Sequence, residues 1–534
     1  MTSLEHFCHS LLRTDQDFGT AFMMLNGIRD SLREEYQAPA EIVLSVCERI
    51  LACPSFTKQS QAYFLYRSVT EILHDVMTRF PSEVKGRRRR ALDLLLTGLT
   101  SPHESLRRAS AEGLGMLPLA VDYGPPTEPD ASAPVPGALQ VLDDDWLAHR
   151  GIQTINGWIW QGRSLLTRTQ SGDTLVVKCL RRGEDPLALQ REAAWMRYLD
   201  RLTPSLERRC DVPIPLEHDE GWLVRAPRFA WQASTRTHLH PKRYAVAFLT
   251  SSDYFHYPNE ADPDRRLSEE AICEVLGRNA WLMGRLMAKG IAHTAPIPLF
   301  HNRAQRHRRE DGGRYRWTHR GRLDRWLATC HHPNFGVSGL RDFEHFTTVA
   351  GRPLLRYETI GSHLISLLLV AGSYFRQKSP ERVGLDANRR PVDARDLFDR
   401  DLLQAIVRRI WEAYAEGFFG QAPGESSAVI PAWLVDRMID EMGVDRHMEE
   451  ILRVVDQQAM SRTMFLSFLQ SRGMSLKEAQ RKVKGAADIT LMTGPHLGGF
   501  NQPISLPELI EFAAAGAAHC VAGQFRREQA LCDG

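Results

Sequence analysis

The sequence lacks several features that would place it in a special class of protein. Its nine cysteines are scattered and none forms a C-x-x-C pair, which argues against a zinc cluster or a disulfide framework. The longest strongly apolar run, 364–371, falls far short of the roughly 20 residues that span a bilayer. Glu5 and Asp15 lie where a secretion signal needs an apolar core. We therefore expect a reduced, cytoplasmic protein without a membrane segment.

The chain also lacks an excess of either charge. Its 534 residues include 67 lysines and arginines against 65 aspartates and glutamates, a net charge of +2. Such a balance carries no global signature of nucleic-acid or membrane binding. With 43% hydrophobic and 25% charged residues the composition is typical of globular proteins, and the length suggests about three domains of roughly 100–200 residues each.

Residues 1–120 are predicted to form an all-helical domain, because glycine and proline are sparse and apolar residues recur at helical spacing. The segment 101–120 resembles one helix of a HEAT-type repeat, while an irregular repeat period leaves a generic helical bundle as the alternative. If the chain binds a protein partner, this HEAT-like domain is the expected surface. The other helices are expected over 40–53, 57–78 and 87–99.

The remaining chain is predicted to divide into four further regions, which makes the whole a multidomain α+β protein. A proline-rich linker comes first, since its composition cannot bury enough apolar surface to fold. A region of short strands follows, with one helix at about 186–202, and then a mostly helical region. A helical C-terminal extension ends the chain. The regions are 121–145 (linker), 146–260 (strands), 261–425 (helices) and 426–534 (extension).

One lysine and one glutamate are the first candidates for a functional ion pair. Lys178 lies in the apolar strand VVKCL, which buries its stem and directs its ammonium to one face. Glu192 follows on a helix whose apolar residues face inward. A helix glutamate fixes the rotamer of a strand lysine in some nucleotide-binding folds, and the lysine then neutralises phosphate charge. The alternative is an ordinary edge-strand lysine and a solvated glutamate.

Further polar residues follow in a meaningful order. The stretch 244–257 is an apolar strand that ends in polar residues, and a long helix over 265–290 leads directly into a loop with His293. Asn302 lies later in the same loop. The apolar segment 336–340 is predicted to be a short strand that leads into Asp342.

Taken in this order, the residues resemble the protein-kinase-like superfamily over about 150–425. The likeness is nearer to its atypical members, such as the selenoprotein-O-like adenylyltransferases and the aminoglycoside-phosphotransferase group. It implies two lobes, an N-lobe at 146–260 and a C-lobe at 261–425, with ATP and Mg²⁺ as cofactors. The implied roles are phosphate binding for Lys178, orientation of that lysine for Glu192, metal binding for Asn302 and Asp342, and the catalytic-loop position for His293.

The sequence departs from the kinase pattern at the glycine-rich loop. No G-x-G-x-x-G precedes Lys178, and Gly157 with Gly162 is a weak substitute. Glycines in such a loop let the backbone approach phosphates, so Gly162 is the cofactor-binding candidate here.

A second departure concerns the general base. Ala295 stands where the catalytic aspartate is expected, two residues after His293, so Thr294 and His301 are the nearest candidates for proton transfer. An alternative assigns the metal to Asn334, eight residues before Asp342, and the base to Asp324. We rank it second because the loop with His293 follows directly on the helix.

Two basic segments raise the question of nucleic acid. The insertion at 303–333 is rich in arginine with interleaved tryptophan and tyrosine, a combination that can bind phosphates and stack on bases. The cluster at 85–90 is also basic. We favour solvated segments in both cases, because runs of charge usually face solvent.

The sequence thus supports an ATP-binding, kinase-like protein that transfers a phosphoryl or adenylyl group. A catalytically inactive kinase-like scaffold is the main alternative, favoured by the missing aspartate. A nucleic-acid-associated factor is the weaker one.

Overall fold

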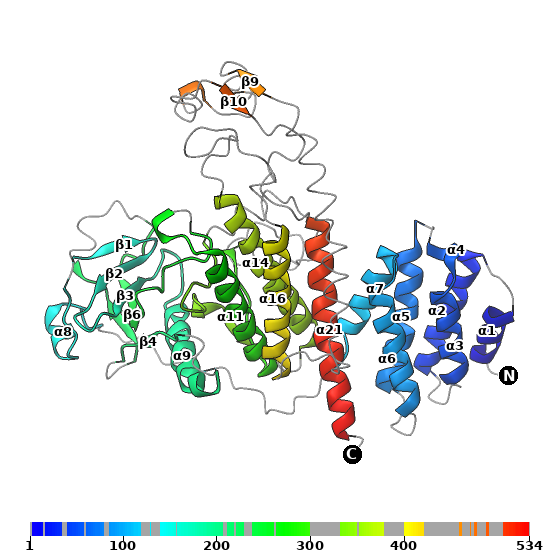
Figure 1. Ribbon diagram of the computed structural model, residues 1–534. Coiled ribbons are helices and arrows are strands. Elements are labelled where there is room, and N and C mark those ends of the chain that lie inside the picture. Colours follow the sequence, from blue (N-terminus) through cyan, green and yellow to red (C-terminus); the bar gives the residue numbers. More distant parts are fainter. Residues whose placement is uncertain are drawn as a thin grey trace.

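The computed structural model is a mixed α+β protein whose parts follow one another along one direction (Figure 1). An N-terminal helical array lies at one end, a small sheet lies at the other, and long helices lie between them. Among the described residues, no helix has both the length and the apolar character needed to cross a bilayer. The described residues are 3–13, 17–34, 40–57, 60–79, 85–118, 129, 139–155, 157–206, 211–217, 221–228, 238–260, 263–298, 332–349, 352–378, 400–420, 459–461, 470, 475–477, 488–490 and 506–532.

The N-terminal array consists of short helices that bury apolar stripes. In α3, Val43, Cys47 and Ile50 recur at helical spacing and are buried. These stripes meet in a shared core because neighbouring helices pack against each other. The helices are α1 (Ser3–Arg13), α2 (Phe18–Glu34), α3 (Ala40–Leu51), α4 (Pro54–Thr57), α5 (Ala62–Arg79), α6 (Lys85–Leu99) and α7 (Glu104–Gly115).

The central helices are long and cross one another closely. The hydroxyl of Ser268 accepts a hydrogen bond from the backbone N–H of Ala271 at 3.2 Å and so caps the start of α11. A Cβ at Gly284 would lie 2.2 Å from the carbonyl oxygen of Tyr414, so the crossing of α11 with α16 requires glycine. The central helices are α11 (Glu269–Ala288), α14 (Pro353–Lys378), α16 (Arg400–Phe419) and α21 (Leu506–Cys532).

The array packs directly on the central helices. A Cβ at Gly115 in α7 would lie 2.3 Å from the ring of Tyr357 in α14, and α21 packs against both α7 and α14. The apolar core is therefore continuous from Cys8 to Phe525. Most of the linker predicted over 121–145 lies outside the described residues.

The sheet is antiparallel throughout and has the strand order β1-β2-β3-β6-β4, with β5 also paired to β6. α8 (Asp144–Ala148) packs against one face of the sheet and α9 (Leu187–Leu202) against the other. The strands are β1 (Ile159–Gln161), β2 (Ser164–Arg168), β3 (Thr174–Cys179), β4 (Ile214–Pro215), β5 (Leu223–Arg225) and β6 (Tyr244–Thr250). Single 3₁₀ turns lie at η2 (Thr203–Leu206) and η3 (Pro263–Arg265).

The region 426–534, predicted to be a helical extension, is described only in part. It contributes α21 and an antiparallel strand pair, β9 (Ala459–Ser461) with β10 (Asp488–Thr490). The strand pair has no counterpart in our prediction.

Candidate functional site

Lys178 lies between the sheet and α9 because side chains alternate along β3. Val177 points into the core on the α8 side, whereas Val176 and Lys178 point toward α9. Glu192 lies within the apolar stripe of α9 and is completely buried. The ammonium of Lys178 donates to Oε1 of Glu192 at 2.5 Å and to Oδ1 of Asp342 at 2.8 Å. A strand, a helix and a distant turn thus converge on one cation.

Asp342 reaches this position from a left-handed turn. Its backbone has φ 51° and ψ 60°, a conformation that few non-glycine residues adopt and that often marks functional sites. The 3₁₀ turn η6 (Phe343–His345) follows, and α9 packs against it. Phe343 is buried and stacks on Phe346 with ring centroids 5.3 Å apart. The packing of η6 therefore holds the carboxylate of Asp342 toward Lys178.

The segment before Asp342 is a loop, which corrects the strand predicted over 336–340. Phe335 and Leu340 form a single isolated bridge, and Gly339 has φ 136°. Glycine permits this reversal of the chain, so the apolar residues fold back on themselves instead of extending as a strand.

His293 packs beside the turn that holds Asp342 and is not among the residues that line the cavity described below. It ends β7 (Ile291–His293), which pairs with β8 (Phe346–Thr348), and it is 1% exposed. Its Nδ1 accepts from the N–H of Ala295 at 3.3 Å, and its Nε2 donates to the carbonyl oxygen of Arg341 at 2.7 Å. Burial lowers its pKa to about 4, so the ring is neutral. These contacts suit a positioning role better than the predicted catalytic one.

The β1–β2 hairpin covers the other side of the site. Gly162 and Arg163 form its two-residue turn, and Gly162 has φ 59°, which glycine adopts without strain. Nη2 of Arg163 lies 2.8 and 2.7 Å from the two carboxylate oxygens of Glu344, and its Nη1 lies 3.3 Å from Glu184. Arg163 is 7% exposed, so this buried ion pair ties the hairpin to the turn that follows Asp342.

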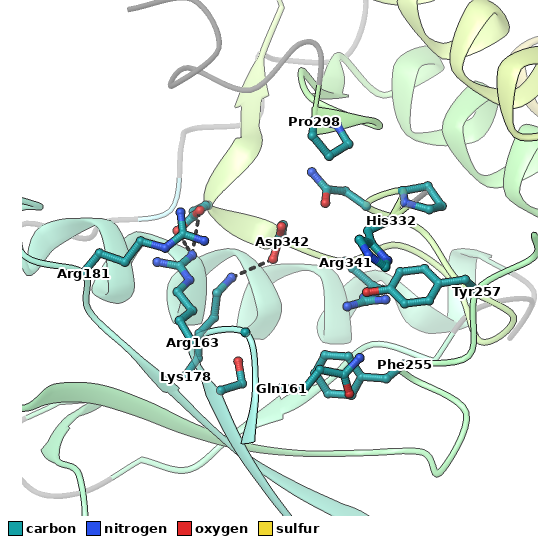
Figure 2. A pocket seen from close by; sticks show the side chains of 15 residues that line it. Gln161, Arg163, Lys178, Arg181, Phe255, Tyr257, Pro298, His332, Arg341 and Asp342 are labelled. Atoms are coloured by element: carbon teal, nitrogen blue, oxygen red, sulfur yellow. Dashed lines mark hydrogen bonds and ion pairs between the residues drawn. The ribbon is translucent and has the colours of Figure 1, made fainter. Parts of the chain in front are cut away.

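A cavity of 580 Å³ opens between the hairpin and the Asp342 turn. Figure 2 shows Asp342 in its middle, with Lys178 and Arg163 to one side and Arg341 with Tyr257 to the other. The lining residues are Gln161, Gly162, Arg163, Ser164, Lys178, Arg181, Phe255, Tyr257, Pro298, His332, Pro333, Asn334, Arg341, Asp342 and Glu344.

The charges around Lys178 are not equivalent. Burial alone would raise the pKa of Asp342, but the nearby positive charges of Lys178 and Arg163 lower it well below its usual range. Complete burial instead raises the pKa of Glu192 to about 7, despite the attraction of Lys178. The Oε2 atom of Glu192 also finds no hydrogen-bond partner in the part of the chain that the structure describes. Asp342 is therefore the permanent counter-charge of Lys178, whereas Glu192 titrates near neutral pH.

The structure brings some of the predicted site residues together and is silent on others. Lys178, Asp342 and Gly162 line the cavity, and Glu192 contacts Lys178 from a fully buried position. Asn302, His301 and the alternative base Asp324 lie outside the described residues.

Asn334, the alternative metal ligand, lines the cavity. Its Nδ2 donates to the carbonyl oxygen of Ala295 at 2.7 Å, which leaves Oδ1 as the atom able to ligate a cation. Within the described part of the chain, no three acidic, histidine or cysteine side chains form a ready-made metal cluster. A cation at this site would thus depend on oxygen atoms from a ligand as well.

Sequence reasoning missed several residues of the cavity. Arg163 gave a weak signal, since it directly follows the candidate glycine. Phe255 and Tyr257 belong to the aromatic end of the predicted 244–257 segment, which could have marked them as lining residues. Arg181 and Arg341 gave no signal, because only the folded chain brings them to the same cavity.

The comparisons with known proteins give one partial similarity. No protein-family model matches the chain. The calmodulin-dependent glutamylase SidJ of Legionella pneumophila is 25% identical over 232 residues. The match covers 40% of this chain and 25% of SidJ, so the chain spans about a quarter of the length of that relative.

Proposed function

We propose that this protein binds ATP with Mg²⁺ in the 580 Å³ cavity and transfers a phosphoryl or adenylyl group. The observation that carries the proposal is the buried Lys178, which contacts Glu192 at 2.5 Å and Asp342 at 2.8 Å at the edge of that cavity. This trio resembles the one expected for the protein-kinase-like superfamily, in which the lysine holds phosphates, and so supports the proposal. The strands and α9 would then act as the N-lobe, and α11 with α14 and α16 as the C-lobe.

The residues present fit such a ligand. Lys178, Arg163 and Arg181 offer positive charge at one side of the cavity, and the added Cβ of a residue at Gly162 would meet nothing within 4 Å, so the hairpin turn leaves open space. Asp342 is the carboxylate that would hold Mg²⁺, with Asn334 as its partner. The metal neutralises phosphate charge when bound.

We further propose that the acceptor is a carboxylate. Ala295 stands where a catalytic base is expected, and a hydroxyl acceptor needs such a base. A carboxylate is already ionised at neutral pH. An attack by its oxygen on phosphorus forms the new O–P bond and breaks a P–O bond of ATP, releasing ADP or pyrophosphate. SidJ is named a glutamylase, and joining glutamate through a carboxyl group requires that carboxyl to be activated.

A catalytically inactive scaffold is the competing function, favoured by the same Ala295. The two differ in turnover, since a scaffold can bind ATP without transferring any part of it. A carboxylate acceptor removes the main reason to prefer the scaffold, because its chemistry does not use the missing base.

A thermal-shift titration of the full chain with ATP and Mg²⁺ tests the proposal, since a ligand that binds only the folded state raises the melting temperature. We expect a shift that Lys178→Ala removes and that Asp342→Asn makes independent of Mg²⁺. ATP labelled at the α- or γ-phosphate then distinguishes adenylyl from phosphoryl transfer. Equal ATP shifts in the folded wild type and both variants would contradict the proposal.

A further inference from the structure

The second side of the cavity is built around Arg341, the residue before Asp342. Its guanidinium carbon lies 5.1 Å from the ring centre of Tyr254 and 4.6 Å from those of Phe255 and Tyr257. The guanidinium is thus fixed in an aromatic cage, which restricts its rotamers before any ligand binds.

Arg341 differs from the other buried cations of the site because no carboxylate of the described residues forms an ion pair with it. Lys178 contacts two carboxylates, and Arg163 contacts Glu344 and Glu184. No ion pair to Arg341 is found among the described residues, and its Nε and Nη1 atoms are buried without a hydrogen-bond partner. Arg341 is only 8% exposed. Burying an unpaired charge and unpaired donors is costly, and aromatic rings compensate only part of that cost.

The unpaired donors belong to a residue that lines the cavity. Figure 2 shows Arg341 beside Tyr257 and His332, on the side of Asp342 away from Arg163. The carbonyl oxygen of Arg341 is held by His293 at 2.7 Å, so its backbone is fixed together with that of Asp342. A group bound at Arg341 would therefore lie in the same cavity as one bound at Lys178.

We propose that Arg341 is an anion-binding residue, whose guanidinium takes up a carboxylate or phosphate oxygen of a ligand in the cavity. The inference rests on the proposed function in one respect, that the cavity is a ligand site. It does not require ATP at the Lys178 side. The anion has two sources, a carboxylate of the acceptor or a phosphate of the nucleotide, and both offer the charged acceptor atoms that a guanidinium binds best.

Calorimetric titrations of the full chain test this inference with four probes: succinate, inorganic phosphate, ATP with Mg²⁺, and succinamide as the uncharged analogue of succinate. If the anion belongs to the acceptor, succinate binds and succinamide does not. If it belongs to the nucleotide, succinate fails while ATP binds. In either case Arg341→Leu should lower the affinity for the anionic probe at least about tenfold, which is the usual effect of losing a charge-assisted hydrogen bond.

Two further variants separate this role from a structural one. Arg341→Lys keeps the charge and should retain part of the anion affinity, which a loss of aromatic packing alone would not predict. Lys178→Ala should abolish ATP binding, whereas any succinate binding should persist and still depend on Arg341. The two results distinguish a failure of the proposed ATP site from a failure of the proposed anion site. The inference is overturned if folded wild-type protein binds none of the anions, or if a folded Arg341→Leu variant binds them as the wild type does.

Discussion

Two groups of ion pairs in this molecule have similar chemistry and opposite surroundings. In the N-terminal array, Arg90 of α6 contacts Glu41 at 3.1 Å and Glu48 at 2.5 Å, both on α3. At the candidate site, Lys178 likewise contacts two carboxylates, at 2.5 and 2.8 Å. The side chain of Arg90 is 38% exposed, whereas those of Lys178 and Glu192 are 6% and 0% exposed.

The difference shows that distance alone does not measure what an ion pair contributes. Exposed pairs typically contribute about 0–1 kcal/mol, because water already solvates both partners. In a buried pair the loss of one partner leaves the other uncompensated, at about 3–5 kcal/mol. Burying charged groups at the site therefore costs free energy that the exposed pairs of the array do not require. Buried charges of this kind are typical of ligand-binding sites.

The largest effect is expected from removing the cation of the site. Lys178→Met should destabilise the protein by about 3–5 kcal/mol, because Glu192 and Asp342 lose their counter-charge. The double variant Lys178→Met/Glu192→Leu should recover much of that stability, since an apolar pair can replace a buried ion pair. Denaturant unfolding measures both. If the double variant were no more stable than the single one, compensation of buried charge would not explain the effect.

The titration of Glu192 gives the second effect. Its pKa is about 7 in the folded protein against 4.5 for an ordinary glutamate, so the folded state holds the extra proton between these values. This contribution to stability is fully present below pH 4.5 and is lost as pH rises through 7, by roughly 3 kcal/mol. Glu192→Gln removes the titrating group, so its melting temperature should fall less between pH 5 and pH 8 than that of the wild type. Parallel pH profiles would show that Glu192 is ionised throughout.

The substitution Arg163→Leu is expected to have an intermediate effect on stability. Arg163→Leu should cost about 2 kcal/mol, since Glu344 loses its charge-assisted hydrogen bonds but is 12% exposed and can be hydrated. Because this pair ties the β1–β2 hairpin to the turn after Asp342, ATP affinity should fall as well. Arg168→Leu on the exposed end of β2 is the matched control, expected to change neither quantity. A variant that lost stability but kept full ATP affinity would separate the hairpin from the ligand site.

Local pattern predicted the parts of the site that depend on one element at a time. The period of two along β3 directs Lys178 to the α9 face, and the helical period of α9 places Glu192 among apolar residues. The order of the segments along the chain pointed to Asp342. These features are readable because each is set by residues close in sequence.

The contacts of residues that depend on distant parts of the chain could not be predicted from the sequence. The ring of His293 donates to the carbonyl oxygen of Arg341, 48 residues away, and sequence order cannot reveal which way a ring points. The sequence ranks Asn302 above Asn334, because the loop with His293 follows directly on the helix. Of the two, only Asn334 belongs to the described residues, and it lines the cavity. Among the described residues, no carboxylate of another element forms an ion pair with Arg341, and such a feature of the folded chain has no local sequence pattern.

The smallest effect is expected from the exposed pairs of the array. Arg90→Ala should change the free energy of unfolding by less than about 1 kcal/mol, because Glu41 and Glu48 are 57% and 54% exposed and remain hydrated without it. Glu41 also keeps its contact with Arg87 at 3.1 Å. The effect should shrink further at about 1 M salt, where the screening length falls to about 3 Å. That of Lys178→Met should persist, because the side chains of Lys178 and Glu192 are buried and salt screens buried charges much less. Denaturant unfolding of both variants at low and high salt measures the contrast. A loss of several kcal/mol at Arg90 would mean that position in the fold, and not exposure, decides what an ion pair contributes here.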